Sequence, residues 1–430
     1  MSRYKESEKL LERALKTIPL GSQTFSKSMV QYPFGVSPYF IKRGEGSQIW
    51  DFDGNQYIDF INALLSVFLG HSDPDVTKAV REQQSQGVNF SLPSKLEMEV
   101  AELIVEMVPC AEMVRFGKNG TDVTTAATRL ARAYTQKDHI AVCGYHGWED
   151  WYIGSTSRDV GIPESIKKLT HTFKYNDIES LEEIFNSFSG QVACVILEPM
   201  NLEYPQNDFL KKVHDIAKKN NALLIFDEII TGFRFANGGA QELFGVTPDL
   251  AVFGKGMANG HPLSAVVGNR SIMQLMEKIF FSSTFGGETL SLAAAKAVLL
   301  KCNKESVYKN IEEKGQRIIE GVKNIIQEND MGGYFDITGH PSWSFLRIKS
   351  YAKYNNSEIL TLFLQEIFKR GILSLGTHNI SYAHSSKDIE KLLEVYKIVF
   401  PIIAEAIRSE KLNQLLKAKP LEPIFKVRGS

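Results

Sequence analysis

The chain of 430 residues lacks several features that would each point to a special class of protein. It has no apolar run near the roughly 18 residues that a membrane-spanning helix needs. Its charges almost balance, with 49 Lys and Arg against 50 Asp and Glu. Neither sign of charge is in the excess that nucleic acid or an anionic membrane surface would attract. We therefore expect no nucleic acid and no membrane among its partners.

Cysteine is also scarce. The four cysteines lie singly in apolar or helical stretches, at Cys110, Cys143, Cys194 and Cys302. Neither a disulfide framework nor a zinc site has such spacing. The N-terminal stretch is charged and helix-patterned, without the apolar core of a signal peptide. These features predict reduced thiols, a cytoplasmic location and no metal site.

The common phosphate-binding motifs are missing as well. The chain contains no GxxxxGK[ST] loop, and no GxGxxG follows a predicted strand, which weakens a dinucleotide-binding interpretation. There is no internal repeat and no low-complexity linker. The length suits two or three domains, and a hydrophobic content of 43% allows a sizeable core.

The middle of the chain alternates short apolar runs with helical patterns. The runs cover residues 139–144, 193–198, 222–228, 249–255 and 264–269, and helices are predicted at 121–134 and 207–220. Strands that are apolar on both faces and separated by helices indicate a mostly parallel sheet covered by helices. The predicted fold class is therefore α/β.

The two ends of the chain have another pattern. The N-terminal segment predicts a hairpin around Asp53-Gly54-Asn55. After residue 305, long amphipathic helices at 305–328, 357–370 and 386–408 accompany a short strand at 344–348. We expect a large domain over 61–304 and a smaller α+β domain over 305–430, with residues 1–60 packing on the smaller one.

Ionisable and aromatic residues lie at the ends of four of the predicted strands or directly after them. They are Tyr145 and His146, then Glu198, then Asp227 with Glu228, and finally Lys255. Ligands of parallel α/β sheets bind at the carboxyl ends of the strands. Any one of these residues could simply be a charge that faces water at a strand end. Four strand ends with such residues favour a binding site.

A glycine-rich segment, FGKNGTD at 116–122, leads into the helix predicted at 121–134. Free backbone N–H groups and the helix dipole make such a start suitable for a phosphate, to which Thr121 could donate its hydroxyl. An ordinary capped helix start is the alternative interpretation.

Together these residues match the needs of pyridoxal 5′-phosphate. Its aldehyde needs a lysine, its ring nitrogen an acid, its ring a flat face, and its phosphate a helix N-terminus. The matching candidates are Lys255, Asp227, Tyr145, and Gly120 with Thr121. Gly254 and Gly256, which flank Lys255, are interpreted as leaving room for the ring.

Long motifs in the chain resemble those of the class III pyridoxal-phosphate-dependent aminotransferases, and among these most of all the glutamate-1-semialdehyde aminomutases. The motifs are FDEIITGFR (226–234), GGAQELFGVTPDL (238–250), WDFDGNQYIDF (50–60), GYHGW (144–148), VILEP (195–199) and SYAHSSKDIEK (381–391). The resemblance covers nearly the whole chain.

The resemblance implies PLP fold type I, with a large parallel-sheet domain and a small domain formed by both chain ends. It also implies a homodimer with shared active sites, in which Thr284 of SSTFGGETL reaches the phosphate of the neighbouring subunit. Glu228 matches the acid after the ring-nitrogen aspartate, and Glu198 matches a glutamate near the cofactor edge. His146 is included as a cofactor contact, with packing or hydrogen bonding as its alternative.

The chain departs from the aminomutase pattern around the substrate. Lys27 stands where the aminomutases have an arginine suited to a carboxylate, and lysine is a point charge, not a bidentate fork. Leu64 replaces an aromatic residue, and residues 286–289 (GGET) replace SGNP. Lys27 is thus a candidate substrate contact, and the substrate is expected to differ.

The predicted function is an aminotransferase that moves an amino group from a small amino donor to a carbonyl acceptor. Lys255 would hold the cofactor as an internal aldimine and then act as the base, with ping-pong kinetics. The alternative is an aminomutase, which moves the amine within one molecule. A cofactor-free Schiff-base lyase and a binding protein on an aminotransferase scaffold are the interpretations outside this chemistry. The substrate stays open between a carboxylate-bearing amino acid, a phosphorylated small ketone and a sugar intermediate.

Overall fold

The computed structural model describes residues 3–422, which divide into two units. The terminal unit comprises residues 3–64, 69–73 and 310–422, and the central unit comprises 65–68 and 74–309. The domain limits expected at residues 60 and 304 stay a prediction. That prediction also includes residues 1–2 in the first segment and 423–430 in the last, and these residues lie outside the described part of the chain.

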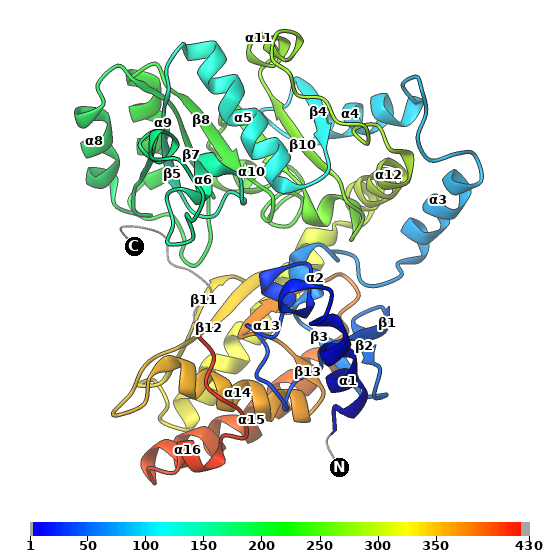
Figure 1. Ribbon diagram of the computed structural model, residues 1–430, viewed down its shortest axis with the longest axis vertical. Helices are drawn as coiled ribbons and strands as arrows, with labels where there is room; N and C mark the ends of the chain where they lie inside the picture. The colour runs from blue at the N-terminus through cyan, green and yellow to red at the C-terminus, as the bar shows by residue number, and fades with distance from the viewer. Residues whose placement is uncertain (1–2, 423–430) are drawn as a thin grey trace. The chain divides into compact units, whose positions relative to one another are not determined.

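The central unit contains a seven-stranded sheet (Figure 1). Its strands, in sheet order, are β4 (Met113–Gly117), β10 (Ser264–Gly268), β9 (Leu250–Phe253), β8 (Leu223–Asp227), β7 (Val192–Leu197), β5 (His139–Cys143) and β6 (Thr170–Thr172). The pairs from β9 through β6 are parallel, and β10 is antiparallel to both neighbours. The predicted mostly parallel sheet is therefore confirmed.

The reversal at β10 follows from the length of its connection. Residues 254–263 join β9 to β10, and parallel neighbours need a crossover of about a dozen residues or more. The short connection permits only an antiparallel return. Sequence periodicity missed β4 and β6, because β4 is only partly buried and β6 spans three residues.

Helices cover the sheet, as expected for strands that are buried along their whole length. The helix α5 packs across β4 and β7 to β10, and α9 packs on β7 and β8 (Figure 1). The helices of this unit are α3 (Pro74–Gln84), α4 (Lys95–Met107), α5 (Gly120–Thr135), α6 (Asp150–Ile153), α7 (Glu164–Lys167), α8 (Ile178–Ser187), α9 (Phe209–Lys219), α10 (Ala240–Phe244), η3 (Lys255–Ala258), α11 (Arg270–Met273), η4 (Gln274–Glu277) and α12 (Thr289–Glu305).

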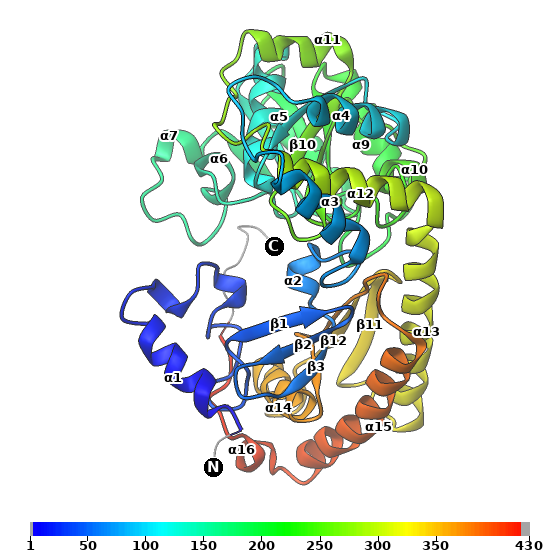
Figure 2. The same ribbon diagram turned by 90° about the vertical axis from the view of Figure 1, so that its right-hand side faces the viewer.

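The terminal unit combines both ends of the chain in one sheet (Figure 2). Strands β1 (Ile41–Glu45), β2 (Gln48–Asp51) and β3 (Gln56–Asp59) are antiparallel, and β13 (Ile372–Leu373) pairs with β3. The turn at Asp53-Gly54-Asn55 joins β2 to β3, so the predicted hairpin is confirmed. The Asp53 carboxylate accepts hydrogen bonds from the first N–H groups of α1 (Lys5–Ala14).

The remaining elements of the terminal unit form a second sheet and its helices. The strands are β11 (Phe335–His340), β12 (Trp343–Ile348) and β14 (Thr377–Asn379), and the helices are η1 (Pro19–Gly21), η2 (Phe25–Lys27), α2 (Asn62–Leu65), α13 (Val307–Glu328), α14 (Asn356–Lys369), α15 (Ser386–Arg408) and α16 (Leu412–Leu415), of which α2 and α13 continue into the central unit. No helix within residues 3–422 combines the length and the apolar character that crossing a bilayer requires.

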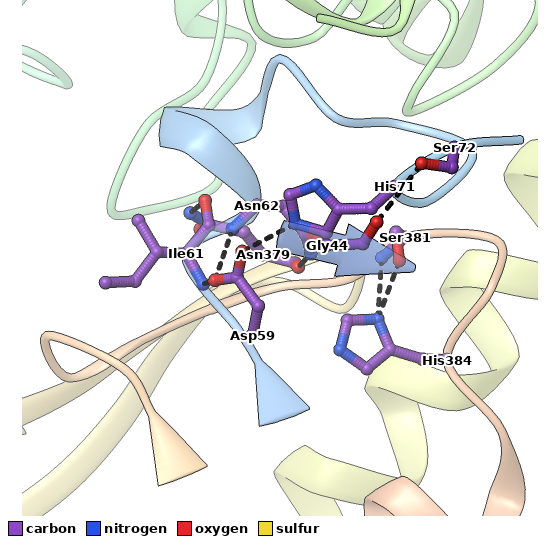
Figure 3. Close-up of polar contacts among 9 residues, drawn as sticks. All are labelled: Gly44, Asp59, Ile61, Asn62, His71, Ser72, Asn379, Ser381 and His384. Carbon is purple, nitrogen blue, oxygen red and sulfur yellow. Dashed lines mark hydrogen bonds and ion pairs between the residues drawn. The ribbon is translucent and has the colours of Figure 1, made fainter. Parts of the chain in front are cut away.

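The short turn α2 has an unusual backbone. Four successive non-glycine residues, Asn62 to Leu65, have φ angles between 47° and 70°. Left-handed geometry costs roughly 1–2 kcal/mol for an ordinary residue and less for asparagine. Side chains hold the start of the turn, because Asp59 accepts from the N–H groups of Ile61 and Asn62 at 2.9 Å each (Figure 3).

A pair of amides adds to this hold. The Asn62 amide donates to the Asn379 carbonyl, and the Asn379 amide donates to the Ile61 carbonyl at 2.8 Å (Figure 3). The amide nitrogens must face these carbonyls, because a carbonyl can only accept. The polar contacts around the turn therefore fix a backbone that propensity alone would disfavour.

Candidate functional site

A cavity of about 360 Å³ opens in the central unit at the carboxyl ends of its strands. We call it the strand-end cavity. The predicted residues that line it are Gly120, Thr121, Tyr145, His146, Glu198, Asp227 and Lys255. They come from the ends of β5, β7, β8 and β9 and from the start of α5. The structure thus brings seven of the ten predicted site residues together.

Lys255 is placed by a tight turn just after β9. It begins η3 with a φ of +42°, in the left-handed region that side chains seldom adopt. A Cβ at Gly254 would lie 3.1 Å from Ile229 Cδ1, and one at Gly256 would lie 3.1 Å from Phe68 Cβ. The small residues beside Lys255 therefore make room for Ile229 and Phe68. The expectation that they also make room for a cofactor ring stays a prediction.

The surroundings of Lys255 favour the neutral amine. Burial lowers the pKa of Lys255 below its ordinary value of 10.5, while the carboxylates of Glu198 and Asp227 act in the opposite direction. The positive charge of Arg234 adds to the lowering. A neutral amine can attack a carbonyl carbon or accept a proton, and an ammonium can do neither.

Asp227 forms a buried pair with His146. Asp227 Oδ2 lies 2.8 Å from His146 Nδ1, and His146 Nε2 lies 3.2 Å from the Cys143 carbonyl oxygen. The bond to the His146 ring fixes the orientation of Asp227, as the hydrogen-bonding interpretation of His146 predicted.

Glu198 supports the aromatic wall of the cavity. Its Oε2 accepts from the Tyr145 N–H at 3.0 Å and from Asn201 Nδ2 at 2.9 Å. Burial, and next to it the charge of Asp227, raise the pKa of Glu198. Gly144 has a φ of +106°, and a Cβ there would lie 2.5 Å from Glu198 Oε2. The Glu198 carboxylate therefore requires glycine at position 144, and its hydrogen bond to the Tyr145 N–H fixes the backbone there.

Tyr145 presents a half-exposed ring to the cavity. The ring of Tyr152 meets it edge to face, with 5.6 Å between ring centroids. Tyr152 itself is fully buried and donates to the Gly144 carbonyl at 2.7 Å. The Tyr145 ring is therefore supported from behind and offers a flat face for stacking.

The start of α5 forms the anion-binding end of the cavity. Thr121 is buried, and its hydroxyl has no hydrogen-bond partner among the described residues. The first N–H groups of the helix, at Gly120 and Thr121, have no carbonyl four residues earlier within the helix. A Cβ at Gly147 would lie 2.5 Å from Thr121 Oγ1, so the approach to this hydroxyl requires glycine.

This donor set fits pyridoxal phosphate. The cavity offers a buried lysine amine, a carboxylate held by a histidine, an aromatic face and an unpaired hydroxyl at a helix N-terminus. The unpaired hydroxyl of Thr121 lines the cavity beside the first N–H groups of α5, so it can donate to an acceptor such as a phosphate.

Glu228 has a different task from the predicted cofactor contact. Its carboxylate accepts from the N–H groups of Ala240 at 2.7 Å and Gln241 at 2.9 Å, and from the Thr231 hydroxyl. It is fully buried at the start of α10 and does not line the strand-end cavity. Successive strand side chains point to opposite faces, so Asp227 and Glu228 diverge.

Two further predicted residues lie elsewhere. Thr284 is exposed in the connection before α12, where its carbonyl accepts from the side chain of Asn89 at 3.3 Å. Lys27 is exposed at the end of η2 in the terminal unit. The structure of the single chain does not bring either into the strand-end cavity, and their roles stay predictions.

Sequence reasoning missed several residues of the cavity wall: Ser66, Lys118, Trp148 and His261. Lys118 lies inside the FGKNGTD segment, so the segment itself was the available signal. It pairs with Glu288, which caps α12, at 3.0 Å. Ser66 carried no signal, because only tertiary packing brings residues 65–68 into the central unit.

Comparisons with known proteins agree with this site. The family model described as Aminotransferase class-III matches residues 31–379. A relative named glutamate-1-semialdehyde 2,1-aminomutase, from Sulfurihydrogenibium azorense, is 37% identical over 86% of this chain and 93% of its own.

Two solved structures are similar over nearly their whole length. The FumI protein of Sphingopyxis sp. MTA144, in its PLP internal aldimine form, has a TM-score of 0.88 at 27% identity, covering 97% of this chain and 99% of its own. An omega-transaminase from Sphaerobacter thermophilus has a TM-score of 0.83 at 26% identity, covering 93% and 98%. The expected fold type is confirmed by these neighbours.

Proposed function

As the chain belongs to the class III aminotransferase family and is an enzyme whose cofactor is pyridoxal phosphate, we propose that it transfers an amino group from a small amino donor to a carbonyl acceptor, by a ping-pong mechanism with Lys255 as the catalytic amine. The observation that carries the proposal is the meeting of Lys255, Asp227 and the unpaired hydroxyl of Thr121 in one cavity.

Each residue has a definite task in this scheme. When bound, the cofactor supplies an aldehyde that combines with amines and a ring that accepts electrons when a proton leaves the substrate carbon. Lys255 would bind the aldehyde and, as a free neutral amine, would carry a proton at Nζ. Asp227, oriented by His146, would stabilise the positive charge of the ring nitrogen.

Other residues bind and position the cofactor. Tyr145 supplies the stacking face, which Glu198 fixes through the Tyr145 N–H. The hydroxyl of Thr121 and the N–H groups at the start of α5 would hold the phosphate. Glu228 supports the same strand end from the opposite side, through α10.

A second candidate is an aminomutase, which returns the amine to the same molecule. The specific observation in its favour is the name of the curated relatives, glutamate-1-semialdehyde 2,1-aminomutase, at 34–37% identity. The argument against it comes from the sequence resemblance, in which Lys27, Leu64 and residues 286–289 depart from the aminomutase pattern around the expected substrate. The aminotransferase interpretation gives these departures a reason, because they alter substrate contacts while the cofactor residues are retained.

Stoichiometry separates the two candidates. The holoenzyme is mixed with a panel of amino donors, without an acceptor, and the keto product is counted per site. An aminotransferase releases one equivalent and stops until an acceptor is added. If glutamate-1-semialdehyde is converted in many turnovers with no keto product, the aminomutase is the correct assignment.

We further propose a homodimer, supported by an apolar surface beside Thr284. Its exposed apolar residues are Val88 and Phe90 in one segment and Phe285 in the other. Hydrogen bonds join its two segments, from Thr289 N–H to the Val88 carbonyl and from Asn89 to the Thr284 carbonyl. Sedimentation velocity should give twice the chain mass, and a monomer at micromolar concentration would rule the dimer out.

A cytoplasmic location is also proposed. It is supported by four free cysteines, all buried and none paired within residues 3–422. Fractionation of the native host, followed by immunodetection, should find the chain with the cytosolic proteins. Recovery in a secreted fraction would contradict this location.

A further inference from the structure

Arg234 is the largest of the fully buried side chains of the chain's described part. It lies seven positions after Asp227 (234 − 227), in a tight turn that begins at the end of β8. In this turn, Gly232 N–H donates to the Glu228 carbonyl and Arg234 N–H donates to the Thr231 carbonyl. The backbone that positions Asp227 therefore also positions Arg234.

The guanidinium of Arg234 contacts a short segment that we call the strap, residues 65–68. Its Nη2 donates to the Leu65 carbonyl at 3.3 Å, and its Cζ lies 5.2 Å from the centroid of the Phe68 ring. These residues belong to the central unit, although residues 64 and 69 on either side belong to the terminal unit. Arg234 thus contacts both ends of the strap: it donates a hydrogen bond to Leu65 and makes a cation–π contact with Phe68.

The strap, in turn, packs on the turn that carries Lys255. A Cβ at Gly256 would lie 3.1 Å from Phe68 Cβ and 3.7 Å from the Leu65 carbonyl oxygen. Ser66, in the middle of the strap, lines the strand-end cavity. Leu65 also has a φ of +70°, a strained conformation that persists only where its surroundings impose it. The Asn62 and Asn379 amides hold the start of the short turn α2 (Figure 3), and Arg234 holds its last residue, Leu65.

We propose that Arg234 is a positioning residue, which clamps the strap onto the turn of Lys255 and thereby fixes Ser66 in the wall of the strand-end cavity. Arg234 does not line the cavity, so it acts through the strap and not on the substrate. The proposal rests on the proposed function only in treating Lys255 as the reacting amine.

A consequence for Lys255 follows from the charge of Arg234. The charged groups facing Lys255 are Glu198 from the end of β7, Asp227 from the end of β8, and Arg234 from the turn after β8, with His146 bonded to Asp227. The two carboxylates favour the ammonium form of Lys255, and Arg234 opposes them. Loss of the Arg234 charge should therefore raise the pKa of Lys255.

The test uses the apoprotein, so that activity plays no part in it. Arg234→Lys keeps the charge but loses the planar fork, and Arg234→Met loses both. Arg132→Met is the matched control, because Arg132 also donates to a backbone carbonyl, that of Asp138 at 2.9 Å, on the outside of α5. Hydrogen exchange of the strap and acylation of Lys255 as a function of pH are both read by mass spectrometry, and circular dichroism checks the fold.

We expect strap amides to exchange about tenfold faster in both Arg234 variants. The midpoint of Lys255 acylation should move to higher pH in Arg234→Met and stay near wild type in Arg234→Lys. Arg132→Met should change neither readout. Unchanged strap exchange in a folded Arg234→Met protein overturns the clamp, whichever transfer reaction the holoenzyme proves to catalyse. If Arg234→Met does not fold, the Arg234→Lys exchange result alone decides.

Discussion

The strand-end cavity of the central unit and the polar cluster of the terminal unit are both buried and rich in ionisable groups, but their groups are arranged differently. In the cavity, a lysine, two carboxylates and an unpaired hydroxyl face a common space. In the cluster, side chains bond to one another and to the backbone: Asp59 with His71 at 2.9 Å, and His384 Nδ1 with the Ser381 N–H at 3.0 Å (Figure 3).

His378, which follows the same pattern, lies between Ser344 Oγ and Tyr396 Oη, at 2.9 Å from each. Burial alone lowers its pKa to about 3, so it stays neutral at physiological pH. Groups bonded in this way stabilise one conformation, whereas the groups of the strand-end cavity line a space that a ligand can enter. Burial of polar residues therefore indicates function where the buried groups also line a cavity.

The largest effect should come from replacing the amine of the cavity. Lys255→Ala removes both the nucleophile and the base, and we expect kcat to fall by ~10⁴-fold or more. Borohydride should no longer fix the cofactor to the chain. Lys118→Ala, which removes the other lysine of the cavity wall, should leave fixation intact. Fixation of cofactor to the Lys255 variant would make the assignment wrong.

The adjacent acids Asp227 and Glu228 allow the same comparison between a group that lines the cavity and a group that only stabilises the fold. Asp227→Asn should lower kcat by ~10²-fold or more, because the charge partner of the ring nitrogen is lost. Glu228→Gln should instead lower the free energy of unfolding by ~1–3 kcal/mol, because the bonds at the start of α10 weaken. Steady-state kinetics and urea unfolding of both variants check the split. Equal effects on kcat would erase the distinction drawn between them.

The unpaired hydroxyl predicts a smaller effect on cofactor binding. Thr121→Val keeps the shape but removes a bond to a charged group worth ~1.5–3 kcal/mol, so the affinity of the apoprotein for pyridoxal phosphate should fall about tenfold to a hundredfold. Fluorescence titration measures it. Thr128→Val is the control, since the Thr128 hydroxyl already donates to the Thr125 carbonyl at 3.0 Å. Unchanged affinity in Thr121→Val would place the phosphate elsewhere.

The smallest predicted effect concerns His378 in the terminal unit. The unfolded chain protonates this histidine below its ordinary pKa of 6.5, and the folded chain only near 3. Its stabilising effect is therefore complete above pH 6.5 and is lost as the pH falls toward 3. In His378→Gln, the fall in unfolding free energy between pH 7 and pH 5 should be smaller by about 1–2 kcal/mol. Urea unfolding of the wild type and of the variant at both pH values measures it.

Much of the fold could be predicted from the sequence. The five predicted strands of the central sheet and the long C-terminal helices are present, because their patterns depend on burial along one element at a time. The site was predictable to a similar degree. Lys255, Asp227, Glu198 and Tyr145 each lie at or just after the end of a buried strand, and the ends of parallel strands share one edge of a sheet.

What could not be predicted depends on contacts between distant segments. The sequence does not reveal that the Glu228 carboxylate caps α10 or that Phe68 packs on Gly256, because both facts depend on how loops return to the sheet. It also does not reveal that Arg234 reaches Leu65, 169 positions earlier (234 − 65).

The sequence by itself therefore determined the class of sheet, the order of its elements and the chemical groups at its edge, since these follow from local periodicity and from the direction of parallel strands. Tertiary structure alone decided which group faces which. It paired His146 with Asp227, left the Thr121 hydroxyl without a partner and set Arg234 behind the strap. The physical reason is that proton positions, desolvation and charge balance depend on distances of a few ångströms between residues far apart in the chain.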